Sequence, residues 1–266
     1  MYIKNTKSTL FISKSKNIND IPTLFIHGFT GSSKSWSSIR SKLTTSTISV
    51  DIPGHGKSIF NDLGDTYFFK DFSNELYISL LQMKIKKVNL CGYSLGGRLA
   101  ITFAAKYPEM ISSLLLESTS LGIEDRTDRE IRYKKDLGMA DSIKENLVEF
   151  SKNWSINKLF EHQSSRNEIE FNNQKIIRES HNKQQLANSL KTFSVGNMPF
   201  LRNQFQKFSF PIIIVNGKDD IKYIKEGRDM LKLNNHAKQY IINKASHNVH
   251  LENEESFIEI LSDFNN

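Results

Sequence analysis

The sequence contains a single cysteine, Cys91, among its 266 residues. An intramolecular disulfide therefore cannot form, and the zinc and iron–sulfur sites that are built from clusters of cysteines are excluded. This cysteine usage is typical of proteins from a reducing compartment. We therefore expect a cytoplasmic protein.

Long apolar runs are lacking as well. The first twenty residues contain no apolar stretch of the kind found in secretory signal peptides, and no later run approaches the length that a membrane-spanning helix needs. We therefore expect no membrane as a partner.

Dense runs of one charge are missing, although 36 Lys and Arg outnumber 29 Asp and Glu and give a formal net charge of +7. The basic residues are scattered and do not alternate with aromatic residues, which argues against nucleic acid as a partner. A surface of this kind favours the approach of small anionic molecules.

Short apolar segments alternate with helical patterns in the first half of the chain. Helical spacing of apolar residues predicts a helix over 66–84, and a second helix is predicted to end before Pro108. This alternation predicts an α/β fold with a mostly parallel central sheet flanked by helices. The expected strands cover 23–26, 47–54, the segment just before Gly92, 112–118, 210–217 and 237–243.

The character of the chain changes after residue 120. Residues 121–196 are rich in Lys, Asn, Gln, Glu and Ser and keep a helical spacing of apolar residues without a clear strand. We interpret 121–196 as an inserted helical cap and 1–120 together with 197–266 as the core. A last helix is expected over 254–264.

The segment GYSLG at 92–96 carries the first chemical signal. Glycines on both sides of Ser94 permit a strained turn between a strand and a helix, which exposes the serine hydroxyl. The backbone N–H groups of Leu95 and of Phe29, in the loop after the first strand, could then converge on a developing oxyanion.

An activated serine needs a base and an acid that orients the base, in the chain order serine, acid, histidine. Asp220 follows the strand at 210–217, and Asp219 beside it is an alternative. His247 follows the strand at 237–243 and is our candidate base, with His250 as the alternative. His27 and His55 lie in glycine loops that shape the site, and neither is assigned a proton-transfer role.

Arg98 lies four positions after the serine, in the first turn of the expected helix. A cation there is disfavoured by the positive end of the helix dipole, so its presence points to an anionic group nearby.

The segments HGFTGS, DIPGHGKS, GYSLGG, GKDD and ASHNVHLE together resemble the α/β-hydrolase superfamily over most of the chain outside the cap. Further segments, among them GYSLGGRLA, NWSINKLF and RESHNKQQLANSL, include parts of the cap. They resemble more closely the MenH family, the 2-succinyl-6-hydroxy-2,4-cyclohexadiene-1-carboxylate synthases of menaquinone biosynthesis.

The MenH resemblance implies a lyase that eliminates pyruvate from 2-succinyl-5-enolpyruvyl-6-hydroxy-3-cyclohexene-1-carboxylate. It implies that Ser94, with its proton drawn toward His247 and with Asp220 orienting the imidazole, removes a proton from this substrate. The Phe29 and Leu95 N–H groups would stabilise the enolate-like oxygen. The resemblance implies no cofactor and no metal.

The partner implied by the same resemblance is a small-molecule tricarboxylate. The substrate-binding residues that match the family's motifs are Arg98, Arg132, Arg178, Trp154 and Tyr93, with Arg129 as an alternative to Arg132. Several guanidinium groups suit a ligand with three carboxylates, because each can make a bidentate contact.

Two residues depart from the MenH family's pattern. Leu121 stands where the family usually has proline, and Ser246 replaces the glycine that commonly precedes the histidine. Both positions shape backbone loops, so the departures bear on loop geometry rather than on chemistry.

Two other functions remain open for these residues. The first is a serine hydrolase of carboxylic esters or carbon–carbon bonds with Ser94 as a covalent nucleophile. The second is a non-catalytic relative that binds a ligand. The sequence does not distinguish a monomer from a homo-oligomer.

Overall fold

The computed structural model describes residues 1–18, 20–64 and 66–264, and within this part of the chain it has one nine-stranded sheet. The strand order is β1-β2-β4-β3-β6-β7-β8-β9, and β5 pairs with β2. The strands are β1 (Tyr2–Lys4), β2 (Ser8–Lys14), β3 (Thr23–Ile26), β4 (Thr47–Val50), β5 (Ile59–Phe60), β6 (Val88–Tyr93), β7 (Ile111–Glu117), β8 (Ile212–Gly217) and β9 (Ala237–Ile242).

The sheet is parallel from β4 to β9, as the alternation of segments predicts. The α/β fold class is thereby confirmed. β1 and β2 form an antiparallel hairpin, which joins the sheet through an antiparallel pair of β2 with β4. These two strands and β5 were not predicted, although Leu10 and Ile12 alternate with less buried neighbours in β2.

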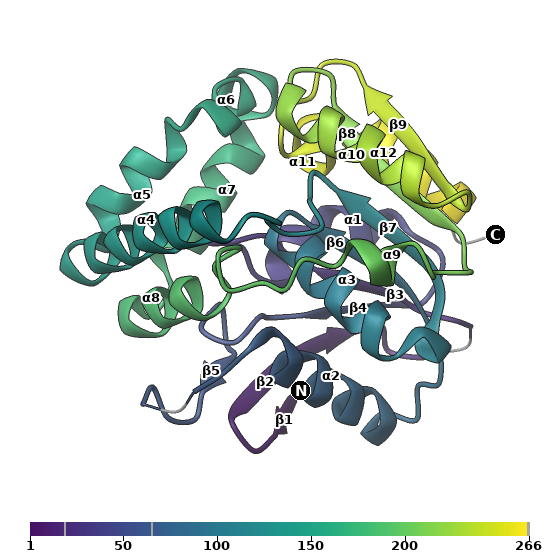
Figure 1. Cartoon of the computed structure of the whole chain (residues 1–266), viewed down its shortest axis with the longest axis horizontal. Coiled ribbons are helices and arrows are strands. Elements are labelled where there is room, and N and C mark those ends of the chain that lie inside the picture. Colours follow the sequence, from purple (N-terminus) through teal and green to yellow (C-terminus); the bar gives the residue numbers. More distant parts are fainter. Residues whose placement is uncertain (19, 65, 265–266) are drawn as a thin grey trace.

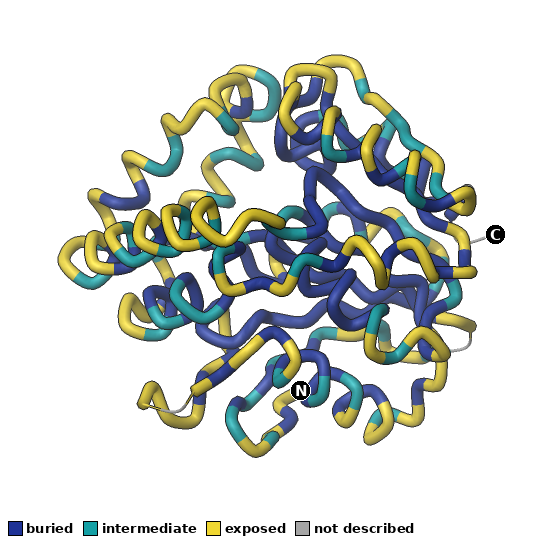
Figure 2. Tube along the Cα trace, in the orientation of Figure 1, coloured by how far each residue is buried: buried dark blue, intermediate teal, exposed yellow. Residues whose placement is uncertain are grey.

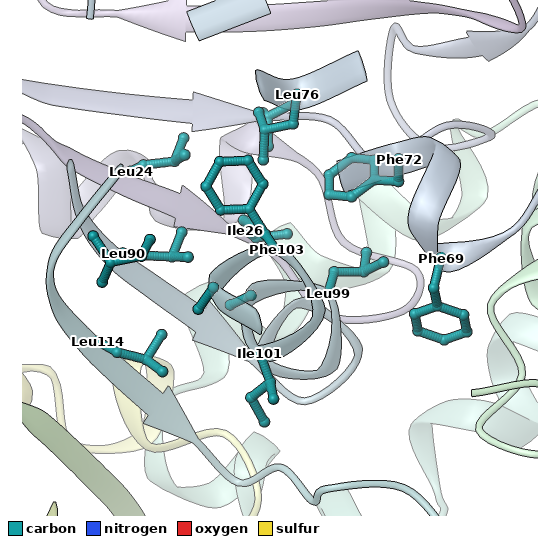
Figure 3. Close-up of a cluster of buried hydrophobic side chains, with 14 of the residues drawn as sticks. Leu24, Ile26, Phe69, Phe72, Leu76, Leu90, Leu99, Ile101, Phe103 and Leu114 are labelled. Atoms are coloured by element: carbon teal, nitrogen blue, oxygen red, sulfur yellow. The ribbon is translucent and has the colours of Figure 1, made fainter. Parts of the chain in front are cut away.

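Helices cover both faces of the sheet because its central strands are apolar on both sides. Leu24 and Ile26 of β3 pack on one face, against a cluster that includes Phe72 and Phe103 (Figure 3), whereas Phe25 faces the other side. The core helices are α1 (Ser37–Lys42), α2 (Phe69–Gln82), α3 (Leu95–Lys106), α9 (Arg202–Phe205), α10 (Ile221–Leu233), α11 (Val249–Glu252) and α12 (Glu254–Phe264).

Figure 2 shows the result of this covering: the middle strands are buried and the outer turns of the helices are exposed. α2 begins and ends within the predicted range 66–84. α12 has the bounds that the sequence predicts.

The segment between β7 and β8 contains helices and no strand. Five of these helices lie together beside the sheet, as Figure 1 shows. They are α4 (Arg126–Glu145), α5 (Leu147–Ser155), α6 (Gln163–Arg166), α7 (Glu168–Glu179) and α8 (Lys183–Thr192). Three of them, α4, α5 and α8, share a small apolar cluster of Ala140, Ile143, Phe150, Leu186, Ala187 and Leu190.

Asparagine and aspartate side chains fix where these helices begin. Asp125, Asn146, Asn167 and Asn182 precede α4, α5, α7 and α8, and each accepts a hydrogen bond from a backbone N–H in the first turn. Such caps satisfy N–H groups that have no partner within the helix. The abundant Asn of this segment therefore defines its helix boundaries.

The turn between β6 and α3 holds Ser94 in a strained conformation, with φ 51° and ψ −107°. A Cβ on Gly92 would lie 2.5 Å from the carbonyl oxygen of Gly96, and a Cβ on Gly96 would overlap the carbonyl oxygen of Ile26. Both glycines are therefore required for the close approach of α3 to β3 and β6.

No helix in the described part of the chain is long and apolar enough to cross a membrane.

A pair of glycine substitutions tests this account of the turn. We expect Gly96→Ala to lower the free energy of unfolding by about 2–3 kcal/mol, since the new methyl group meets backbone that cannot move independently. Gly138 lies exposed within α4 with no heavy atom near the added Cβ. Gly138→Ala should therefore raise the free energy of unfolding by about 0.5–1 kcal/mol. Urea denaturation measures both, and equal effects would contradict the steric argument.

Candidate active site

Ser94, His247 and Asp220 form a continuous hydrogen-bonded chain. The Ser94 hydroxyl lies 3.0 Å from Nε2 of His247, and Nδ1 of His247 lies 2.8 Å from the Asp220 carboxylate. The side chains of His247 and Asp220 are almost completely buried. The three residues follow β6, β9 and β8, whose carboxyl ends meet at one edge of the sheet. This geometry can draw the serine proton onto the imidazole.

The two alternative residues lie elsewhere. Asp219 forms an ion pair with Arg166 of α6, and the Asp219 side chain is 45% exposed. His250 directs Nδ1 to Glu117, 2.8 Å away, and its ring stacks on Trp36. Neither residue contacts Ser94, so the structure brings together the acid and the base that were our first candidates.

Phe29 and Leu95 line the same cavity as Ser94. Within the described residues neither N–H has a hydrogen-bond acceptor. Nδ1 of His27 lies 2.7 Å from the carbonyl oxygen of Gly28. This carbonyl and the Phe29 N–H belong to one trans peptide and point in opposite directions, so His27 helps to orient the Phe29 N–H.

A cavity of about 270 Å³ lies over the serine, and two of the expected arginines line it. Arg98 is 7% exposed, and its Nε atom has no hydrogen-bond partner among the described residues. Burial is the main cause of the lowered pKa of Arg98. The nearby Arg132 also lowers this pKa, whereas Tyr223 and Asp136 raise it. A buried guanidinium with a free donor at a cavity wall is suited to bind an anion.

Arg132 reaches the same cavity from α4. Its Nε lies 2.9 Å and 3.0 Å from the two carboxylate oxygens of Asp136, whose side chain is fully buried. Asp136 also accepts a hydrogen bond from Ser194. Arg132 is thus held in place through its Nε. Arg129 does not line the cavity.

Arg178 lies outside this cavity, in the wall of a smaller neighbouring one of about 30 Å³. Its guanidinium donates to Ser151 and Ser155 of α5, 3.1 Å and 2.5 Å away. Burial lowers the pKa of Arg178 to about 10, so the side chain keeps its charge at neutral pH. Tyr93 and Trp154, together with Phe29 and Phe160, line both cavities and so form an aromatic layer that the two cavities share.

The sequence reasoning missed six cavity residues with charged or polar side chains. They are Lys135, Asp136, Asn157, Ser194, Lys222 and Tyr223. Helical spacing could have indicated the first two, because residues three and four positions after Arg132 lie on the same helix face. Lys222 and Tyr223 follow Asp220 at the start of α10 and carry no comparable signal.

The positions that depart from the MenH pattern are both buried. Leu121 packs in the main apolar core. The Ser246 hydroxyl donates to Glu252, 2.5 Å away, and the Ser246 N–H donates to the same carboxylate. The serine therefore adds a contact beside His247, and the triad geometry is intact.

Three buried histidines surround the loop that carries Phe29. Each accepts a backbone N–H: His27 from Ile52, His55 from Thr30 and His181 from Gly56. A ring nitrogen that accepts such a bond is unprotonated, so all three rings are neutral. Burial lowers the pKa of His27 to about 4, and it is the main cause of the lowered pKa values of His55 and His181.

A family model described as the alpha/beta hydrolase fold matches residues 22–254. The chain belongs to this family. The predicted superfamily is thereby confirmed.

The relatives in this family also bear out the closer resemblance. A putative 2-succinyl-6-hydroxy-2,4-cyclohexadiene-1-carboxylate synthase of Bacillus subtilis is 34% identical over 241 residues, which cover 90% of this chain and 88% of that protein. The synthase of Serratia proteamaculans is 28% identical, with 91% of each chain covered. The structure of MenH from S. aureus superimposes with a TM-score of 0.89 at 26% identity and covers 96% of this chain and 97% of that one.

The neutral histidines predict how stability depends on pH. A folded-state pKa of about 4 lies below the unfolded value of 6.5, so the unfolded chain binds more protons between these two values. Stability is therefore complete above pH 6.5 and is lost as the pH falls toward 4. We expect His27 alone to lower the free energy of unfolding by about 2 kcal/mol between pH 7 and pH 5. Urea denaturation at the two pH values measures this, and a constant value would contradict the assignment.

Proposed function

We propose that the chain eliminates pyruvate from 2-succinyl-5-enolpyruvyl-6-hydroxy-3-cyclohexene-1-carboxylate to give 2-succinyl-6-hydroxy-2,4-cyclohexadiene-1-carboxylate, a step of menaquinone biosynthesis. The observation that carries the proposal is the guanidinium of Arg98, which is buried and has a free Nε one helical turn from a serine already bonded to a histidine. The relatives named as synthases support the same activity.

The triad serves as a base in this reaction. Ser94 passes its proton to Nε2 of His247, and the serine oxygen takes a proton from the carbon beside the substrate's succinyl ketone. Asp220 stabilises the imidazolium that forms. The electrons left on this carbon, C2 of the ring, form a double bond to C3, the C3–C4 double bond moves to C4–C5, and the bond from C5 to the enolpyruvyl oxygen breaks. The departing enolate becomes pyruvate when its terminal carbon gains a proton, which balances the proton left on His247.

Stabilisation of negative charge at the ketone oxygen is the second contribution to catalysis. Negative charge develops on the ketone oxygen as the proton leaves, and the free N–H groups of Phe29 and Leu95 stabilise it there. The reaction involves no net oxidation or reduction, so the residues of the site suffice for each proton transfer.

The substrate's three carboxylates require cations around the serine. Arg98 and Arg132 line the cavity directly, and Lys135 and Lys222 add two ammonium groups to its wall. Arg178 lies behind the aromatic layer of Tyr93 and Trp154. We propose that it binds substrate after Trp154 shifts, because its hydrogen bonds within the described residues go to hydroxyl and carbonyl groups and not to a carboxylate.

We propose that the helices α4–α8 are the cap of this enzyme. Arg132, Trp154 and Arg178 all come from these helices, whereas Ser94 and His247 come from the core. The cap therefore supplies substrate contacts and the core supplies the proton transfers. A hydrolase of apolar esters could use the same triad, but it would gain nothing from the buried charge of Arg98.

Release of pyruvate is the first test. We expect the purified protein to release pyruvate from the enolpyruvyl substrate at the same rate with and without a metal chelator, and a coupled lactate dehydrogenase assay measures this. Absence of pyruvate together with rapid hydrolysis of p-nitrophenyl esters would identify a hydrolase instead.

Arg98→Ala separates substrate recognition from the triad. Loss of a charge-assisted contact is worth about 1.5–3 kcal/mol, so kcat/KM for the tricarboxylate should fall about 10- to 100-fold. Residual hydrolysis of a neutral ester should stay within about 3-fold of wild type, since it does not need the charge. Arg126→Ala, which removes an exposed arginine of α4, is the control. Equal losses on both substrates would show that Arg98 is structural.

A further inference from the structure

The loop that presents the Phe29 N–H is held in a tight turn. Gly31 N–H donates to the carbonyl oxygen of Gly28, 3.0 Å away, and Thr30 between them has φ 66°. This left-handed conformation costs a β-branched residue such as threonine about 1–2 kcal/mol. The turn therefore persists only where neighbouring groups hold it.

All three polar groups of Thr30 are held by side chains from elsewhere in the chain. Its N–H donates to Nε2 of His55, 3.2 Å away, and its carbonyl oxygen lies 2.9 Å from Nε2 of His181. Its hydroxyl lies 3.4 Å from Nε of Arg178. His55 belongs to the core loop after β4, but His181 and Arg178 belong to the cap, around the connection from α7 to α8.

The hydrogen bond at Nδ1 of His181 shows which ring nitrogen carries the proton. Gly56 N–H donates to Nδ1 of His181, 3.0 Å away, so the ring proton is on Nε2 and points at the carbonyl oxygen of Thr30. His181 is 6% exposed, and its ring meets that of His55 edge to face at 5.4 Å. Nδ1 of His55 in turn lies 3.2 Å from the hydroxyl of Ser189 in α8.

These contacts connect the cap to the oxyanion-binding N–H. The peptide that follows Phe29 is fixed by His55, and the next peptide is fixed by His181. The Thr30–Gly31 peptide, whose carbonyl oxygen contacts His181, also donates its N–H to the carbonyl oxygen of Gly28, and this carbonyl shares a peptide with the Phe29 N–H. The Phe29 N–H therefore cannot turn without breaking one of these hydrogen bonds. The position of the Phe29 N–H thus depends on a residue of the cap.

We propose that His181 is a positioning residue that holds the Phe29 N–H in place through Thr30, so that docking of the cap completes the oxyanion hole. The proposal deepens the proposed function and rests on its assignment of the Phe29 N–H to the developing oxyanion. It gives the cap a role in the proton-transfer step besides its role in binding carboxylates.

Two substitutions of His181 with similar volume provide the test. His181→Met fills the space but has no N–H donor, whereas His181→Gln keeps an amide N–H that can reach the Thr30 carbonyl. His162→Ala removes an exposed histidine of the cap and is the matched control. We compare kcat and KM for pyruvate release and the rate at which a neutral alkyl fluorophosphonate modifies Ser94.

The phosphonate reports on the oxyanion hole without any carboxylate. The Ser94 oxygen forms a bond to phosphorus, fluoride leaves, the serine proton goes to His247, and the phosphoryl oxygen occupies the oxyanion hole. This second readout does not depend on the proposed synthase activity. If the wild-type protein reacts with the phosphonate but releases no pyruvate, the proposed function is overturned. The positioning role of His181 is then judged from the rate of Ser94 modification alone.

We expect His181→Met to lower both kcat and the phosphonylation rate at least about 10-fold with KM within about 3-fold of wild type, since removal of a whole oxyanion donor costs about 100- to 1,000-fold. His181→Gln should recover both rates to within about 3-fold, and His162→Ala should match wild type. Unchanged rates in His181→Met, or a loss confined to the tricarboxylate, would overturn the proposal.

If His181→Met does not fold, Ser189→Ala carries the same test. This substitution removes only the hydroxyl that forms a hydrogen bond with Nδ1 of His55. The phosphonylation rate should then fall about 3-fold or more without a change in KM for the tricarboxylate. A phosphonylation rate equal to that of wild type would contradict the proposal that contacts from the cap hold Thr30 in place.

Discussion

The buried guanidinium of Arg98 is the constraint on which the rest of the site depends. Its guanidinium is buried in the first turn of α3, where the helix dipole disfavours a cation, and its Nε has no partner in the part of the chain that the structure describes. The carboxylate of Asp136 is already engaged by Arg132 and Ser194. A protein gains nothing from this arrangement unless a ligand brings its own negative charge, and the cavity beside Ser94 is where that ligand fits.

Two parts of the chain supply different groups to the site. The parallel sheet brings the ends of β6, β8 and β9 together, so the serine, acid and histidine need no contact with the cap to form their hydrogen-bonded chain. The helices between β7 and β8 supply Arg132 and Trp154. Through His181 they also reach the turn that carries Phe29, so binding and oxyanion stabilisation depend on one docked segment.

Much of this could be predicted from the sequence because the signals are local. The two glycines beside Ser94 are dictated by backbone contacts, and the acid and the histidine follow recognisable strands. The hairpin of β1 and β2 was missed because its place is set by antiparallel pairing with β4, which no local pattern reveals. The contacts of Arg178 and His181 with Thr30 were missed for the same reason, since these residues lie 148 and 151 positions from Thr30 along the chain.

The most direct test of the central claim is binding of the intact tricarboxylate without turnover. Ser94→Ala removes the proton-accepting oxygen and leaves the cationic wall unchanged, so calorimetric titration can measure affinity alone. The account predicts binding at one site per chain, weakened about 10- to 100-fold when Arg98→Ala is added. Equal affinity of the single and the double variant would contradict the claim that the free charge of Arg98 awaits a substrate carboxylate.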